Sequence, residues 1–179
     1  MRIRVFDGIL WGVTFLLVVT VFLMPDTVPL HWDENWQIDG YGSRYMFLIL
    51  AFIPMAIYYG MSLTKHIDPK RMNLEKRKKT YRLFQYGLTV FFLILAAFFE
   101  YSAFNPQQDG EQFVLLLVSV LLIGMGNYLP KIPQNYFFGV KTPWTLASEY
   151  VWKKTHKISG YCFVVIGLIT GISALAHFS

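Results

Sequence analysis

The sequence has 179 residues, of which 55% are apolar and 18% aromatic, and its formal net charge is +5. This apolar share exceeds that of ordinary soluble domains and argues against a soluble fold. The basic residues are not interleaved on a soluble module, so we expect no direct nucleic-acid binding. Cys162 is the single cysteine, which excludes an internal disulfide and a cysteine-based metal site.

Five apolar stretches divide the chain, and each is long enough to cross the hydrocarbon core of a bilayer, about 30 Å. They cover residues 8–24, 45–64, 83–99, 113–129 and 158–176. The first is followed by Met24, Pro25 and Asp26 instead of a small-residue cleavage site, so we expect an uncleaved span. Pro54 lies inside the second stretch and is expected to kink that helix.

The basic residues occupy alternate gaps between these stretches. Fifteen of the 16 Lys and Arg residues precede the first stretch or lie in the gaps 65–82 and 130–157, and Arg44 is the exception. Arg2 and Arg4 are the two that precede the first stretch. Cytoplasmic loops carry such an excess, so the N-terminus is predicted inside the cell and the C-terminus outside. The predicted fold class is therefore all-α: a polytopic transmembrane helix bundle of about five spans.

The gaps suggest three segments. Residues 1–64 form an N-terminal two-span unit with a structured outer loop (25–43), and residues 65–82 form a cytoplasmic basic segment. Residues 83–179 form a three-span domain that contains a cytoplasmic motif loop (127–157). A short outer turn is expected at Asn105-Pro106 and Asp109-Gly110 because these dipeptides favour turns.

The outer loop holds two Pro, two Gly and two Trp residues, which predicts a turn-rich cap with a tight turn at Asp39-Gly40. His31, Asp33 and Glu34 could touch a cation, but their spacing matches no recognised metal site. We therefore favour a structural or hydrogen-bonding role over a metal site and predict no cofactor. Three aromatic residues are expected at the outer headgroup layer: Trp32, Trp36 and Tyr41. The candidate contact residues of this loop are His31, Trp32, Asp33, Asp39, Gly40 and Tyr41.

The motif loop begins where Pro130 and Pro133 stop the fourth span. Thr142 before Pro143 favours the start of a helix, with Thr145 as an alternative cap. We expect this helix to run to about His156 and to lie on the inner leaflet as a short interfacial helix.

The motif loop also carries a resemblance. Three runs of the loop carry it: Asn127-Tyr-Leu-Pro-Lys131, Asn135-Tyr-Phe-Phe-Gly-Val-Lys-Thr-Pro-Trp-Thr-Leu146 and Trp152-Lys-Lys-Thr-His156. Together they resemble the hallmark of the SdpI family. These are bacterial membrane proteins named for immunity to a secreted toxin. The outer loop, from Pro29 to Gly42, resembles the small uncharacterised domain that often precedes the SdpI domain.

The resemblance implies a multi-pass protein of the bacterial plasma membrane that protects its producer against a membrane-active peptide toxin. It further implies signal transduction, in which the toxin-loaded protein holds a cytoplasmic repressor at the membrane. The partners are then the lipid bilayer, the toxin and the repressor. The implied motif and partner-binding residues on the cytoplasmic face are Asn127, Tyr128, Pro130, Lys131, Asn135, Tyr136, Gly139, Lys141, Thr142, Pro143, Trp144, Thr145, Trp152 and His156.

Two alternatives remain open: an intramembrane enzyme acting on a lipid-like substrate, and a small transporter. The spans lack paired acids, and the chain has no HExxH or phosphate-loop motif, so we predict no catalytic residue and no enzyme. Glu100 and His177 lie at outer helix ends, where Glu100 is expected to reach the interface. Gly124 and Gly126, next to Asn127, could line a transport cavity, although small residues more often allow close helix packing.

Overall fold

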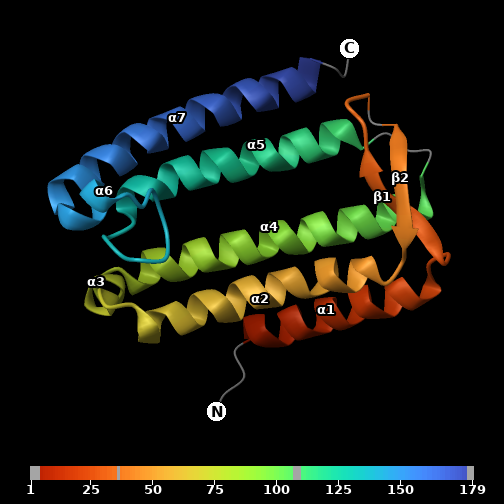
Figure 1. Ribbon diagram of the computed structural model, residues 1–179, viewed down its shortest axis with the longest axis horizontal. Helices are drawn as coiled ribbons and strands as arrows, with labels where there is room; N and C mark the ends of the chain where they lie inside the picture. Colours follow the sequence, from red (N-terminus) through yellow and green to blue (C-terminus); the bar gives the residue numbers. More distant parts are fainter. Residues whose placement is uncertain (1–4, 36, 107–109, 177–179) are drawn as a thin grey trace. The chain divides into compact units, whose positions relative to one another are not determined.

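The computed structural model describes residues 5–35, 37–106 and 110–176. Arg2, Arg4, Trp36, Asp109 and His177, which entered the sequence predictions, lie outside the described residues. Within them, five helices are long and apolar enough to cross a membrane (Figure 1). They are α1 (Val5–Leu23), α2 (Met46–Ile67), α4 (Lys78–Phe104), α5 (Glu111–Tyr128) and α7 (Glu149–Ala176). The predicted five-span helical fold is confirmed.

The outer loop is a β-hairpin, which the sequence prediction missed. Strands β1 (Thr27–Trp32) and β2 (Ile38–Ser43) pair antiparallel, with Thr27 opposite Ser43 and His31 opposite Gly40. The prediction of a turn at Asp39-Gly40 was wrong, because both residues lie within β2. The chain reverses just before β2, where the Asp33 carboxylate accepts hydrogen bonds from the backbone N–H groups of Asn35 and Gln37.

Gly40 has a packing role in place of the predicted turn role. A Cβ atom at this position would lie 2.9 Å from the Cβ of His31 on the paired strand. The register also shifts on both sides of His31, as at a β-bulge. A strand glycine often marks such a close approach, and Gly40 does so here.

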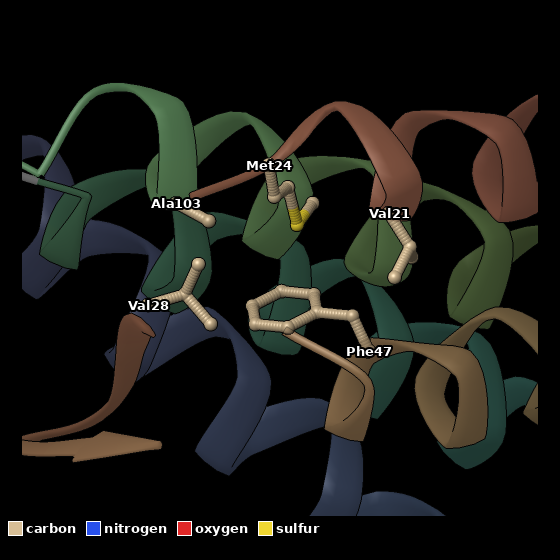
Figure 2. Packing of buried hydrophobic residues seen from close by; sticks show 5 residues of the cluster. All are labelled: Val21, Met24, Val28, Phe47 and Ala103. Carbon is tan, nitrogen blue, oxygen red and sulfur yellow. The ribbon is translucent and has the colours of Figure 1, made fainter. Parts of the chain in front are cut away.

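The chain divides into two compact units. Unit 1 comprises Met1–Ile57 and Thr89–Glu111, and unit 2 comprises Tyr58–Leu88 and Gln112–Ser179. Unit 1 has an apolar core to which α1, β1, α2 and α4 all contribute. Figure 2 shows the Phe47 ring directed between the side chains of Val28, Met24 and Val21, with Ala103 of α4 nearby. This cluster fixes the hairpin to the helices of unit 1.

Glu100 is buried within unit 1, with 3% of its surface exposed. The prediction that it reaches the interface was wrong, because the side chain packs inside unit 1 and is bonded to α1. The Thr20 hydroxyl of α1 donates a hydrogen bond to Oε2 of Glu100. A polar group inside a helix bundle needs such a donor, and Thr20 supplies one to Oε2, while Oε1 is buried without a partner among the described residues.

Unit 2 holds α5 and α7 side by side through small residues (Figure 1). A Cβ on Gly126 would lie 2.6 Å from the carbonyl oxygen of Gly160, so the two backbones meet at this pair. The Ser119 hydroxyl also donates to the carbonyl oxygen of Gly167 at 2.7 Å. Small residues and interhelical hydrogen bonds of this kind join helices in lipid. Gly124, by contrast, faces open space.

The end of the motif loop differs from the prediction. Helix α6 (Pro143–Ala147) begins with a capping box between Thr142 and Thr145 and stops at Ser148. Ser148 is extended, and its carbonyl accepts the backbone N–H of Trp152, so it starts α7 instead of continuing α6. The interfacial helix predicted to reach His156 therefore ends at Ala147, and Glu149 to His156 form the first turns of the last span.

Two further short elements lie in the loops of unit 2. They are α3 (Arg71–Lys76), within the basic segment, and the 3₁₀ helix η1 (Leu129–Lys131), where Pro130 follows α5.

Candidate functional site

The first turns of α7 provide the base on which the motif loop rests. Trp152 and His156 are one helical turn apart, 1% and 0% exposed, and their rings stack with centroids 4.0 Å apart. The Trp152 indole N–H donates to the carbonyl oxygen of Ile132 at 2.9 Å. The spacing of four residues therefore places both rings on one face, against the loop.

His156 binds the loop backbone directly. The backbone N–H of Val140 donates to Nε2 of His156 at 3.1 Å, and Nδ1 lies 2.8 Å from the carbonyl oxygen of Trp152. Because a backbone N–H can only donate, Nε2 must accept and Nδ1 must carry the proton. His156 is thus held as the neutral tautomer, with both ring nitrogens used.

Gly139 lies directly against that imidazole. Its φ is +100°, a conformation that residues with a side chain rarely adopt. A Cβ at this position would lie 2.2 Å from Nε2 of His156. The loop therefore requires glycine here for two reasons, the backbone conformation and the close approach.

Asn135 organises the middle of the loop and is fully buried. Its Oδ1 accepts from the backbone N–H groups of Phe137 and Phe138 at 2.8 and 2.7 Å. Its Nδ2 donates to the carbonyl oxygens of Pro133 and Phe138 at 2.9 and 3.2 Å. One amide thus pairs four backbone groups that no helix or sheet satisfies, which sets the loop conformation.

The basic segment 65–82 contributes a residue that sequence reasoning missed. Asp68 is 1% exposed, and its two oxygens accept the backbone N–H groups of Lys70 and Tyr136 at 2.6 and 2.9 Å. The available signal in the sequence was an acidic residue among eight basic ones. A count of Lys and Arg residues, made to predict membrane topology, does not consider it. Asp68 joins the segment before α4 to the motif loop.

Gln134 forms a second connection to the same segment. Its side chain donates to the carbonyl oxygens of Thr145 and Leu146 at 2.7 and 2.8 Å and accepts from Lys70. The Asn73 side chain donates to the Gln134 backbone oxygen at 3.0 Å. Gln134 and Asn73 were likewise not among the predicted site residues.

Asp68→Asn is expected to destabilise the motif loop by about 1–3 kcal/mol, because an amide N–H₂ would face a backbone N–H in place of one acceptor oxygen. Thermal unfolding in detergent and hydrogen exchange at the Tyr136 amide would measure the effect. Glu75→Gln, an exposed carboxylate on α3, removes the same charge and serves as the control. Equal unfolding temperatures for the two variants would show that Asp68 does not hold the loop.

The predicted motif residues fall into two groups. Asn135, Thr145, Trp152 and His156 are buried and hold the loop together. The exposed residues are Asn127, Pro130, Lys131, Tyr136, Gly139, Lys141, Pro143 and Trp144, while Tyr128 and Thr142 are half-buried. Trp144 is 72% exposed, as is Tyr150 on α7. The loop therefore has a buried, hydrogen-bonded base and an exposed surface that carries aromatic and basic side chains.

The candidate contact residues predicted for the outer loop lie on the β-hairpin or its turn, within unit 1. His31 Nδ1 lies 2.5 Å from a carboxylate oxygen of Asp39 across the two strands. Asp33 is engaged in the turn, and Trp32 packs against the Phe99 ring with centroids 5.6 Å apart. Gly40 lies against His31, and Tyr41 is 64% exposed. Over the described ranges, no three His, Cys, Asp or Glu residues are placed to share a metal ion.

Arg44, the exception to the charge pattern, is tied to the end of α1. Its guanidinium donates to the carbonyl oxygen of Met24 at 2.7 Å and lies 3.3 Å from a carboxylate oxygen of Asp26. A cation near a helix C-terminus is favourable, and Asp26 offsets its charge. Arg44 therefore has a local structural role: it binds the end of α1 and the acidic residue Asp26.

An apolar groove of about 220 Å³ lies beside the hairpin in unit 1. It is lined by Pro29, Leu30, Trp32, Met46, Phe47, Leu50 and Phe99. The acidic residues Asp33, Glu34 and Asp39 lie on the same hairpin or its turn. The hairpin thus combines an apolar groove with negative charge.

Comparison with known proteins supports the resemblance predicted from the sequence. Residues 131–179 match the SdpI/YfhL protein family, and residues 9–55 match a domain of unknown function (DUF1648). Over the whole chain, the sequence is 25% identical to the immunity protein SdpI of Bacillus subtilis strain 168, of which it covers 84%. No solved structure matches the chain. The predicted SdpI-family resemblance, with its N-terminal domain, is confirmed.

Proposed function

We propose that this SdpI-like membrane protein protects the cell that makes it against a secreted, membrane-active peptide. The observation that carries the proposal is the whole-chain similarity to the immunity protein SdpI, which includes both the outer hairpin and the motif loop. The role is binding, not catalysis. In support, the buried polar side chains in and against the motif loop, Asn135, His156 and Asp68 of the basic segment, hydrogen-bond the protein's own backbone.

The outer hairpin is the proposed contact for the peptide. A membrane-active peptide is amphipathic, so it needs an apolar surface, and complementary charge would favour a cationic one. The groove beside Trp32 and Leu30 offers the apolar surface, and Asp33, Glu34 and Asp39 offer the charge. The orientation predicted from the basic loops places this hairpin outside the cell.

The motif loop is the proposed contact for a cytoplasmic partner, a repressor protein in the signalling version of this function. Trp144 and Tyr150 are each 72% exposed, and Lys141 and Lys154 are exposed basic residues of the same segment. Exposed aromatic and basic side chains on a fixed backbone are common in protein interfaces.

Deleting the gene is expected to sensitise the host to the amphipathic peptide fraction of its own culture medium. Membrane depolarisation, followed with a potential-sensitive dye, would report the loss of protection. Restoring the wild-type chain should restore tolerance, and Trp144→Ala should reach the membrane in normal amount and fail to restore it. Equal tolerance with and without the gene, together with turnover of a lipid substrate by the pure protein, would favour the enzyme alternative.

A further inference from the structure

A polar cavity of about 290 Å³ lies in unit 2 beside the motif loop. In Figure 1, α3 and α6 lie at the same end of this unit as the first turns of α7. The cavity is bounded by α3 and the segment after it, by the loop at Pro133, and by the start of α7. Its lining residues are Asn73, Lys76, Arg77, Pro133, Gln134, Glu149 and Lys153.

The charge of this cavity is positive and only partly compensated. Glu149 is the one acid in the lining, and Lys153 binds it at 2.8 Å. Among the residues that the structure describes, no carboxylate forms an ion pair with Lys76 or Arg77. Two cationic side chains are therefore left to face a cavity that an anion could enter.

The walls are held by hydrogen bonds that do not depend on an occupant. Asn73 donates to the Gln134 backbone oxygen at 3.0 Å, and Lys70 donates to the Leu146 carbonyl oxygen at 3.2 Å. These contacts join α3 to the loop and keep the cationic residues near α7. A site built in advance loses less conformational entropy when a ligand binds.

We propose that this cavity binds the phosphate of an anionic phospholipid headgroup. Phosphate oxygens accept several hydrogen bonds at once, which a guanidinium and ammonium groups can donate together. Basic pockets next to spanning helices are known to take such headgroups. The nearby exposed aromatics Trp144 and Tyr150 are typical of the membrane interface, where the phosphate layer lies. The volume suits a headgroup, while the acyl chains stay in the bilayer.

The test compares lipids retained by the purified full chain in detergent, measured by native mass spectrometry. The added lipids are dioleoyl phosphatidylglycerol and dioleoyl phosphatidylcholine in equal amounts. Wild type is expected to retain phosphatidylglycerol preferentially, and K76Q/R77Q should lower this retention by about fivefold or more, a change of the size expected for lost charge-assisted contacts. R82Q/K157Q removes the same charge from exposed positions of α4 and α7 outside the cavity and should retain lipid like wild type.

Equal losses in the two double variants would overturn the proposal, because general surface charge would then explain binding. Inorganic phosphate or a polyglutamate peptide that displaced phosphatidylglycerol at equal concentration would also overturn it. Unfolding temperatures of all variants are compared first. If K76Q/R77Q is unstable, the single variant K76Q on the exposed end of α3 gives the same comparison against K157Q.

Discussion

Replacing Gly139 with Ala is expected to destabilise the protein by about 2–4 kcal/mol, through backbone strain at positive φ and a steric clash. The new Cβ would lie 2.2 Å from Nε2 of His156, which is fully buried and stacked on Trp152 and so cannot move aside. The backbone must shift instead, and the hydrogen bond from Val140 to His156 is lost with it. Thermal unfolding in detergent and hydrogen exchange at the Val140 amide would measure both effects.

Gly124→Ala is the matched control for this experiment. Gly124 lies in α5, where a Cβ would meet nothing within 4 Å, and alanine favours a helix over glycine by about 1 kcal/mol. The control should unfold at or above the wild-type temperature and protect cells normally. If Gly139→Ala behaves like Gly124→Ala, the conformation at Gly139 does not matter for stability, and our description of the loop is wrong.

Asn135→Ala is the second substitution with a large expected effect, about 3–5 kcal/mol, because it leaves buried backbone groups without partners. Phe137 and Phe138 would lose the acceptor of their N–H groups, and Pro133 would lose the donor to its carbonyl oxygen. We expect a lower unfolding temperature, faster hydrogen exchange at the Phe137 and Phe138 amides, and loss of protection.

Two further variants distinguish the effect of losing a buried side chain that holds the loop from the effect of losing an exposed one. Asn135→Asp keeps the acceptor oxygen and removes the donor, so its stability should lie between those of wild type and Asn135→Ala. Trp144→Ala changes an exposed side chain and should alter stability by less than about 0.5 kcal/mol. Protection that survives in Asn135→Ala would contradict a role for the loop conformation in function.

The sequence predicted the five spans because an apolar run long enough to cross a bilayer is a strong, local signal. The hairpin was missed because Pro29 and Gly40 normally argue against strands, and only the pairing of His31 with Gly40 shows why glycine is needed there. Similarly, Ser148 gives no clear sign that it separates two helices. Its role depends on the packing of Trp152 and His156 against the loop, which is not readable from neighbouring residues.

The sequence named the residues of the motif loop but not which of them are buried and which are exposed. The quoted motif covers the residues that build the loop, yet the sequence did not distinguish the buried Asn135 and His156 from the exposed Trp144. Asp68 was missed because its contact with Tyr136 joins positions 68 residues apart, a separation that no local pattern reports. The structure separates the buried residues of the segment from the exposed ones, and its role as a site stays a prediction.

Helix α7 has 28 residues, so at 1.5 Å per residue it is about 42 Å long and exceeds a hydrocarbon thickness of about 30 Å. The first turns of the helix, which carry Trp152 and His156 and are bonded to the motif loop, account for this extra length. No loop or break interrupts the helix between Glu149 and Ala176. Because the helix is continuous, a change in its tilt near Ala176 would also move the turns that carry Trp152 and His156, together with the loop bonded to them.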